Sequence, residues 1–412
     1  MGETVKYQHE IDCLRGLCII IIMLRHTKVF WYADSGSFPD IWFHGWTFFA
    51  VPVFFFISGF SLTLKYGKSI ESIDSKSFYK RRILTLLPLY LIWSFLYFLI
   101  SDFDKEFFGF FLLEFLVRTP IGAVLTIWYI FVVFQLYLLY PLILKRYKKL
   151  SFKMQQILII GIVISMLLSY LIGDLFTDIV FFYLHFGQWF IYFLIGINVA
   201  YYWKEIQNFL RKNVYFKITI SILFLISFAT LPYFVVQTYP RKPAAWILNN
   251  IITIFFLLMV FSQRRIYVSP FISKNHVGTE SFQLEQDFAT KKLNFEGRIF
   301  GYFSKFLYIN GQFSLGLFLS HRFFMQVVSL IFLNFFGIDI DPWREANSRF
   351  DAFLISILYF VLVYIMCMIF TYLMWKLPKS EYIIGKKSLW LSIEKREVIK
   401  YNKKSLKFEG NN

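Results

Sequence analysis

The sequence predicts an all-α polytopic membrane protein, a bundle of about ten transmembrane helices with both termini in the cytoplasm. Of its 412 residues, 58% are hydrophobic, 22% are aromatic and only 17% are charged, whereas a soluble domain has roughly 25% charged residues. A soluble globule could not bury so much apolar surface without leaving large exposed patches. The same composition excludes a disordered chain, a collagen-like chain and a secreted disulfide scaffold.

The net charge of +17 could indicate a nucleic-acid-binding protein. In so apolar a chain, however, we interpret the basic residues first as topology signals, because Lys and Arg gather in the cytoplasmic loops of membrane proteins. The three cysteines, Cys13, Cys18 and Cys367, lie in or beside apolar runs. Neither a disulfide framework nor a cysteine-based zinc site is therefore expected. The sequence contains no His with acidic or Cys partners at metal-binding spacing and no phosphate-binding glycine loop. We predict no metal and no nucleic-acid partner.

The spans follow from the length of the apolar runs, because a transmembrane helix needs about 20 predominantly apolar residues. The stretch 107–118 is apolar but short and contains Glu114 and Arg118, so we interpret it as an interfacial or re-entrant helix. Ten stretches remain as candidate spans: 12–32, 46–64, 83–100, 123–144, 155–173, 179–203, 216–236, 246–263, 306–335 and 352–375.

The orientation follows from the basic residues, which gather in alternate loops and thereby place both termini in the cytoplasm. We expect a membrane domain over 1–378, with a cytoplasmic loop at 264–305, and a basic cytoplasmic tail over 379–412. The loop clusters are Lys65, Lys68, Lys76, Lys80, Arg81 and Arg82; Lys145, Arg146, Lys148, Lys149 and Lys153; Lys204, Arg211, Lys212 and Lys217; and Arg264, Arg265, Lys274, Lys291, Lys292, Arg298 and Lys305.

The first span carries two ionisable residues, and such groups are costly at membrane depth. Arg15 and His26 are eleven residues apart, which returns to within about 20° of one helix face and separates them by about 16 Å along the axis. One inward face therefore holds a cation near the cytoplasmic end and an imidazole beyond the bilayer centre. The alternative is that Arg15 reaches the cytoplasmic interface and His26 only satisfies a neighbouring carbonyl.

Three further groups of polar residues have both a structural and a functional interpretation. Ser58, with Gly59, either allows close helix packing, which the residue types favour, or admits a ligand to the backbone. Lys80, Arg81 and Arg82 open the third span, where a basic cluster serves topology, anionic lipid or the phosphates of a nucleotide-type donor. The ninth span contains the last group, which requires a buried partner or a water-filled cavity: Ser314, His321 and Arg322.

Five segments in order resemble the membrane-bound acyltransferase family 3. IDCLRG at 11–16 resembles the family's opening motif and begins its R-x10-H spacing, here Arg15 and His26. The later segments resemble the family's second helix, its arginine-rich third helix, a middle helix and a late Ser-x-x-x-Tyr-Leu-x-His signature. They are FFAVPVFFFISGFSL, FYKRRILTLLPLY, WYIFVVFQLYLLYPLI and FSLGLFLSH. The resemblance runs from about residue 8 to 375; Phe318 and Thr85 depart from the family pattern.

The resemblance implies a membrane O-acyltransferase of a bacterial cell membrane. Such an enzyme moves an acyl group, acetyl first, from cytoplasmic acyl-CoA to a hydroxyl of a cell-surface or lipid-linked glycan, with no permanently bound cofactor. Arg15 and the 80–82 cluster would hold the donor, and His26 would deprotonate the acceptor hydroxyl. The acyl or acceptor pocket would include Ser58, Ser314 and His321.

The partners implied are a glycan or lipid-linked saccharide acceptor, membrane lipids and proteins of polysaccharide synthesis. A polysaccharide exporter or flippase stays open as the alternative, because ten spans with buried polar groups fit one as well. No inverted repeat of the kind found in many transporters is visible in the sequence, and that favours the enzyme.

Overall fold

The computed structural model describes residues 9–29, 43, 45–67, 74–100, 127–172, 187–238, 244–263 and 295–386, and the regular structure in these ranges is helical. The helices are α1 (His9–His26), α3 (Ala50–Tyr66), α4 (Ser75–Ile100), α7 (Trp128–Tyr147), α8 (Phe152–Ile172), α10 (Gly187–Tyr201), α11 (Trp203–Lys212), α12 (Val214–Thr238), α13 (Ala244–Gln263), α16 (Phe295–Phe336), α17 (Ile340–Ala346), α18 (Arg349–Lys376) and α19 (Glu381–Ile384). This all-helical architecture agrees with the predicted fold class.

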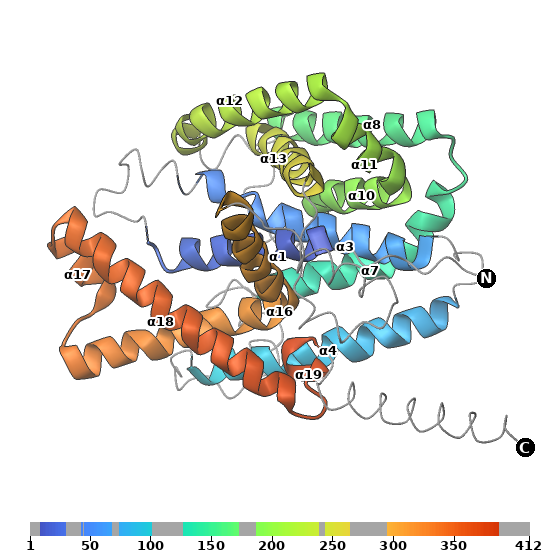
Figure 1. Cartoon of the computed structure of the whole chain (residues 1–412). Helices are drawn as coiled ribbons and strands as arrows, with labels where there is room; N and C mark the ends of the chain where they lie inside the picture. The colour runs from blue at the N-terminus through green and yellow to red at the C-terminus, as the bar shows by residue number, and fades with distance from the viewer. Residues whose placement is uncertain are drawn as a thin grey trace, which may run out of the picture.

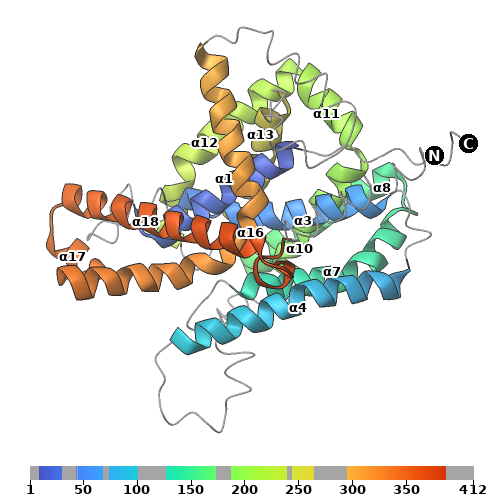
Figure 2. The same cartoon turned by 60° about the horizontal axis from the view of Figure 1, so that its bottom comes forward.

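The centre of the protein is formed by α1, which packs most extensively against α16 and also against α3. Helix α10 covers another side of α3, and α8, α11, α12 and α13 lie beyond it (Figure 1). Helices α4 and α7 pack together on the opposite side of the molecule, where α19 also contacts α4 (Figure 2). Helix α1 therefore contacts both α3 and α16.

Two close helix crossings are made possible by glycine. A Cβ added to Gly16 would overlap the carbonyl group of Leu307, and one added to Gly311 would overlap the carbonyl group of Asp12, so the backbones of α1 and α16 touch. Glycines 59 and 196 bring α3 and α10 together in the same way. The packing interpretation of the small residues in the second span is therefore confirmed for its glycine, because small residues let membrane helices approach closely.

Four helices in the described ranges are long and apolar enough to cross a membrane: Gly45–Tyr66, Trp128–Tyr147, Gly301–Phe336 and Phe350–Lys376. A fifth span results if Trp203–Lys212 and Val214–Thr230 count as one, although they meet at 87°. The apolar helices Phe152–Ser165, Trp189–Tyr201 and Ile247–Ser262 are shorter. The protein is thus a helical membrane protein by the length and composition of its helices.

Two helix boundaries differ from those expected. Helix α16 begins at Phe295, inside the expected loop 264–305, because no proline separates that segment from the apolar run. Helix α11 is a separate amphipathic helix that ends where Asn213 adopts an extended conformation. The Asn213 side chain then accepts a hydrogen bond from the backbone N–H of Phe216 at 2.8 Å and begins α12. The expected interfacial helix 107–118 lies outside the described residues.

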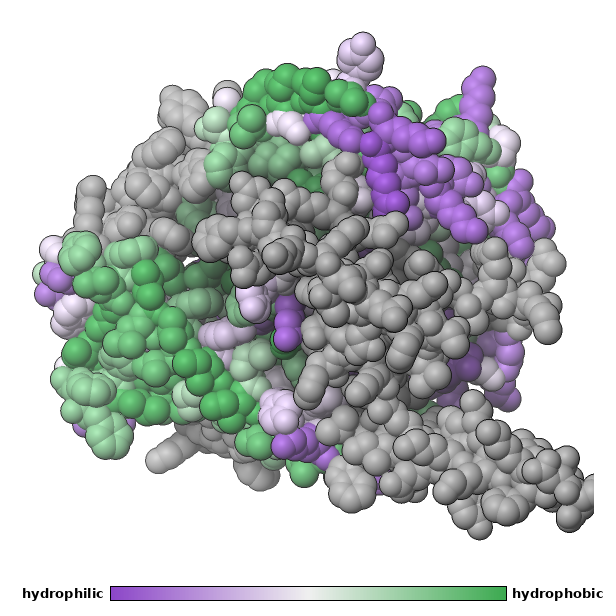
Figure 3. Space-filling view, in the orientation of Figure 1, coloured by the Kyte–Doolittle hydropathy of each residue, from purple (hydrophilic) through white to green (hydrophobic). Residues whose placement is uncertain are grey.

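Residues of three of the four predicted cytoplasmic clusters lie at one end of the described part of the protein. The end of α3, the start of α4, the turn from α7 to α8 and helix α11 all lie at the right of Figure 1. On the face shown in Figure 3, hydrophilic residues gather toward the upper right, whereas the left side is largely hydrophobic. This distribution fits the loop pattern on which the predicted orientation depends.

Candidate active site

Arg15 and its partner Asp12 together join three helices through hydrogen bonds. Its guanidinium donates to Asp12 Oδ1 on α1 and to Ser61 Oγ on α3, both at 2.8 Å. Asp12 Oδ2 in turn accepts from Gln312 Nε2 on α16 at 2.7 Å. About 31% of the Arg15 side chain remains exposed, against 4% of Asp12. The cation is therefore oriented by Asp12 and Ser61, while part of its side chain stays exposed.

Lys386 brings a second cation to the same place. Its Nζ lies 3.2 Å from Gln312 Oε1 and packs over the rings of Phe313 and Trp375. Burial lowers the pKa of the Lys386 amine to about 8. The residue follows α19, which the Trp93 indole anchors by donating to the carbonyl of Ile383 at 2.7 Å. The first residues of the expected basic tail thus pack against the helices that hold Arg15.

His26, at the other end of α1, contacts Arg322 of α16, whose Nη2 lies 2.7 Å from His26 Nδ1. An arginine donates hydrogen bonds and accepts none. The ring nitrogen that faces Arg322 therefore carries a lone pair, and the other ring nitrogen carries the hydrogen. The arrangement provides the buried partner that an arginine in the middle of a span requires.

His321 lies beside His26, with ring centroids 5.2 Å apart and ring planes tilted by 30°. It is fully buried, and its Nδ1 lies 2.7 Å from the carbonyl oxygen of Phe318. Because a carbonyl oxygen only accepts, Nδ1 carries the hydrogen and Nε2 carries the lone pair. His321 Nε2 has no hydrogen-bond partner among the described residues.

Helix α3 runs between the surroundings of Arg15 and those of His26. Its residues Phe54, Ser58 and Ser61 are four and three residues apart and therefore lie on one side of the helix. Ser58 Oγ lies 3.4 Å from the hydroxyl oxygen of Tyr129 on α7. The ring of Tyr129 packs against Phe54 and Phe318, with centroids 6.1 and 5.3 Å away. An aromatic and hydroxyl-lined strip therefore runs from the neighbourhood of Arg15 to that of His321.

The other site residues expected from the sequence divide into two groups. Ser314 is buried on α16, four residues before Phe318, and so lies on the same helix side. Arg82 packs its guanidinium over the ring of Tyr66 at the end of α3, 5.9 Å from the ring centroid, and over two further rings. Lys80 and Arg81 are exposed at the start of α4. Of the basic cluster, only Arg82 is brought against the helix that carries Ser61.

Several residues of the arrangement were not identified from the sequence. Ser61 could have been found by helical spacing, because it lies three residues after Ser58. Asp12 and Tyr129 were noticed only as parts of the matched segments. Gln312 and Lys386 carried no signal, since their neighbours lie 300 and 74 residues away along the chain.

The comparisons with known proteins agree with the resemblance seen in the sequence. A family model described as an acyltransferase domain, acyltransferase 3, matches residues 8–376. A segment of 84 residues is 33% identical to "Protein 2 in picA locus" of Rhizobium radiobacter; it covers 20% of this chain and only 39% of that relative. No solved structure matches the chain.

Proposed function

Because the chain belongs to the acyltransferase 3 family and is a membrane acyltransferase, we propose that it moves an acyl group, acetyl first, from a cytoplasmic acyl-CoA to a hydroxyl of a cell-surface or lipid-linked glycan. The observation that carries this proposal is the pairing of two polar ends along α1. Cations gather around Arg15, and a histidine pair with Arg322 gathers around His26. A donor with a polyanionic head and a reactive thioester at a distance suits such an arrangement.

In this proposal the donor phosphates bind at Arg15, with Lys386 and Arg82 contributing further positive charge. Arginine binds phosphate through a planar fork of donors. The open side of the Arg15 guanidinium provides these donors, while Asp12 and Ser61 hold its orientation. The arm of the donor then lies along the strip formed by Phe54, Ser58 and Tyr129.

The chemical step uses His26 Nδ1 as general base. The acceptor hydroxyl takes the place of Arg322 beside Nδ1 and gives its proton to that nitrogen while its oxygen attacks the thioester carbonyl carbon. The displaced Arg322 guanidinium faces the oxygen on which negative charge develops. When the carbon–sulfur bond breaks, the thiolate leaves and takes the proton back from His26. His321 and Ser314 line the pocket for the acyl group or the acceptor.

The test replaces His26 by glutamine, which keeps the size and hydrogen bonding but takes up no proton at neutral pH. We expect acyl transfer to fall by about 10²–10⁴-fold, while coenzyme A binding stays unchanged. Arg25→Gln is the matched control: its side chain contacts Thr47 and the ring of Phe48. Transfer by His26→Gln at the level of that control would refute the base role.

The exporter remains the second candidate function, because buried ionisable groups also occur along transport pathways. Two measurements on cells that carry His26→Gln distinguish the transferase from the exporter. They are the amount of surface polysaccharide and the number of ester groups per repeat unit. Loss of ester at a normal amount supports the transferase. A reduced amount with normal ester content supports the exporter and contradicts the transferase.

The proposal requires a membrane topology of ten spans with both termini in the cytoplasm of a bacterial cell. The alternating basic loops support this topology. Single cysteines at Ser75 and Ser151 should be inaccessible to an impermeant thiol reagent in intact cells, whereas cysteines at Ser37 and Asp174 should react. Labelling at Ser75 from outside would show that the number of spans is wrong.

A further inference from the structure

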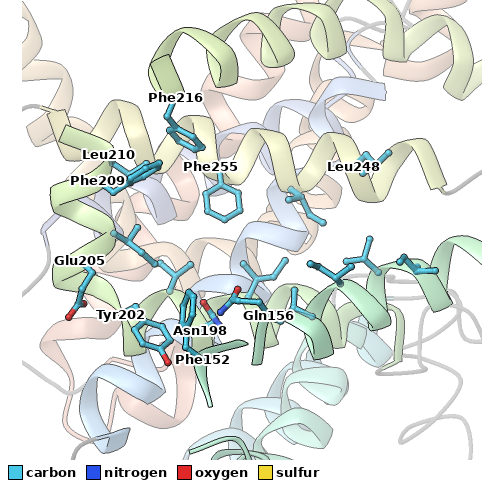
Figure 4. Close-up of a pocket in the computed structure, with 18 residues that line it drawn as sticks. Phe152, Gln156, Asn198, Tyr202, Glu205, Phe209, Leu210, Phe216, Leu248 and Phe255 are labelled. Carbon is cyan, nitrogen blue, oxygen red and sulfur yellow. The ribbon is translucent and has the colours of Figure 1, made fainter. Parts of the chain in front are cut away.

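A cavity of about 730 Å³ lies away from the residues discussed above. It is enclosed by α8, α10, α11 and α13, with one residue from α12 (Figure 4). None of its lining residues belongs to the α1–α3–α16 arrangement. Its volume falls in the range of typical ligand-binding pockets, which are roughly 300–1,000 Å³.

The lining of the cavity is apolar along most of its length. Side chains of α8 and α13, among them Val163 and Phe255, form facing walls. Ile160 and Leu248 line the cavity and yet are 56% and 49% exposed, so the cavity opens sideways between the helices. In a membrane protein this opening faces the acyl chains of the bilayer, which are the apolar molecules present there.

The polar lining residues gather at one end of the cavity, where Figure 4 shows Gln156, Asn198, Tyr202 and Glu205 opposite the end marked by Leu248. Tyr202 is held there by donating to Gln155 Oε1 at 2.8 Å. Gln156 Nε2 is buried and has no hydrogen-bond partner among the described residues. This end can therefore bind the oxygens of an amphiphile whose chain lies in the apolar part.

Basic residues neighbour the lining residues of the polar end along the chain. Lys153 follows the lining residue Phe152, Lys204 precedes the lining residue Glu205, and Arg211 and Lys212 follow Leu210. These cations outnumber the carboxylate of Glu205. Basic residues between helices at the cytoplasmic side of a membrane favour anionic lipid headgroups.

The length of the cavity fits one leaflet. Phe152 and Ile164, the first and last lining residues on α8, are twelve residues or about 18 Å apart along the helix. Half of a hydrocarbon core of about 30 Å is about 15 Å. We propose that this cavity binds one acyl chain of an anionic phospholipid from the surrounding bilayer, with the lipid phosphate beside α11.

The experiment uses the full chain in nanodiscs that contain phosphatidylglycerol with a photoactivatable acyl chain. After illumination, cross-linked residues are located by mass spectrometry. We expect cross-links at Ile195 and Ile206, which line the cavity, and a loss of these cross-links in Val163→Trp, which fills it. The matched control is Ile157→Trp on the exposed side of the same helix. If Val163→Trp fails to fold, Ile159→Phe fills the cavity with a smaller side chain.

The headgroup is tested by Lys153→Gln and Lys204→Gln. Each change should lower cavity cross-linking about fivefold, since a basic residue near an anionic surface contributes roughly 1 kcal/mol. Equal cross-linking in Val163→Trp and Ile157→Trp would overturn the proposal, as would equal labelling by phosphatidylcholine. Displacement of the lipid by palmitoyl-CoA would also overturn it, because the occupant would then be an acyl donor.

Discussion

The contact between α1 and α16 allows a sharp test at Gly311. A Cβ on this residue would lie 2.6 Å from the carbonyl carbon of Asp12, whereas carbon atoms pack best at about 3.5–4.0 Å. Because the carbonyl oxygen of Asp12 would lie closer still, Gly311→Ala must move the two helices apart by at least about 1 Å. The movement separates Gln312 from Asp12 and shifts Arg322 relative to His26.

A misplacement of about 1 Å at a reacting centre can lower a rate by about 10²-fold, and overpacking a membrane-helix contact costs roughly 1–3 kcal/mol of stability. The matched control is Gly301→Ala on the same helix, where an added Cβ meets no atom within 4 Å. That variant should gain helix stability of about 1 kcal/mol or less and keep its activity.

The assay measures release of coenzyme A from acetyl-CoA by purified variants in the presence of membranes that contain the acceptor, together with thermal unfolding. We expect Gly311→Ala to lose transfer by about 10²-fold relative to Gly301→Ala. If the two alanine variants transfer at rates within a factor of about three while both remain folded, the close crossing does not set the geometry of the site.

Three other predictions concern single charged groups. Donor binding measured by calorimetry should weaken as the pH rises through about 8, where Lys386 loses its proton, and Lys386→Arg should remove this dependence. Burial raises the pKa of Asp341, but Lys28 and Arg344 outweigh it and hold the pKa below the ordinary value of 3.8. The Asp341 carboxylate thus stabilises the folded protein at pH values above 3.8, and this stabilisation is lost as the pH falls below that value. In Asp341→Asn, the fall in unfolding temperature that comes from this group at low pH should be absent. Arg322→Gln should lower transfer by about 10–10²-fold, as expected for one lost charged hydrogen bond, and leave coenzyme A binding unchanged; unchanged transfer would contradict its role beside His26.

The helical architecture could be predicted from the sequence because apolar runs and helical spacing are local properties. The eleven-residue step from Arg15 to His26 already placed both on one face. The break between α10 and α12 was expected, because polar and basic residues separate the candidate spans 179–203 and 216–236, but the helix α11 that these residues form was not expected. Local patterns likewise gave no reason to begin α16 at Phe295.

The candidate site could be predicted only in part, because its contacts join segments far apart in the chain. Arg322 was recognised as a buried group in need of a partner, but nothing near it in the sequence identified His26, 296 residues away. Lys386 was assigned to the basic cytoplasmic tail, since a reversal of the chain after α18 is needed to bring it to Gln312.

The parallel course of α1 and α16 gives the site a fixed length. Gln312 and Arg322 are ten residues or about 15 Å apart on α16, and Arg15 and His26 are about 16 Å apart on α1. Since the helices touch backbone to backbone at Gly16, neither can slide along the other without a clash. The two helices thus act as a length gauge. In the function proposed above, the donor is accepted when the distance from its phosphates to its thioester matches this spacing, whatever acyl group it carries. A thioester without the nucleotide would then reach His26 without being held.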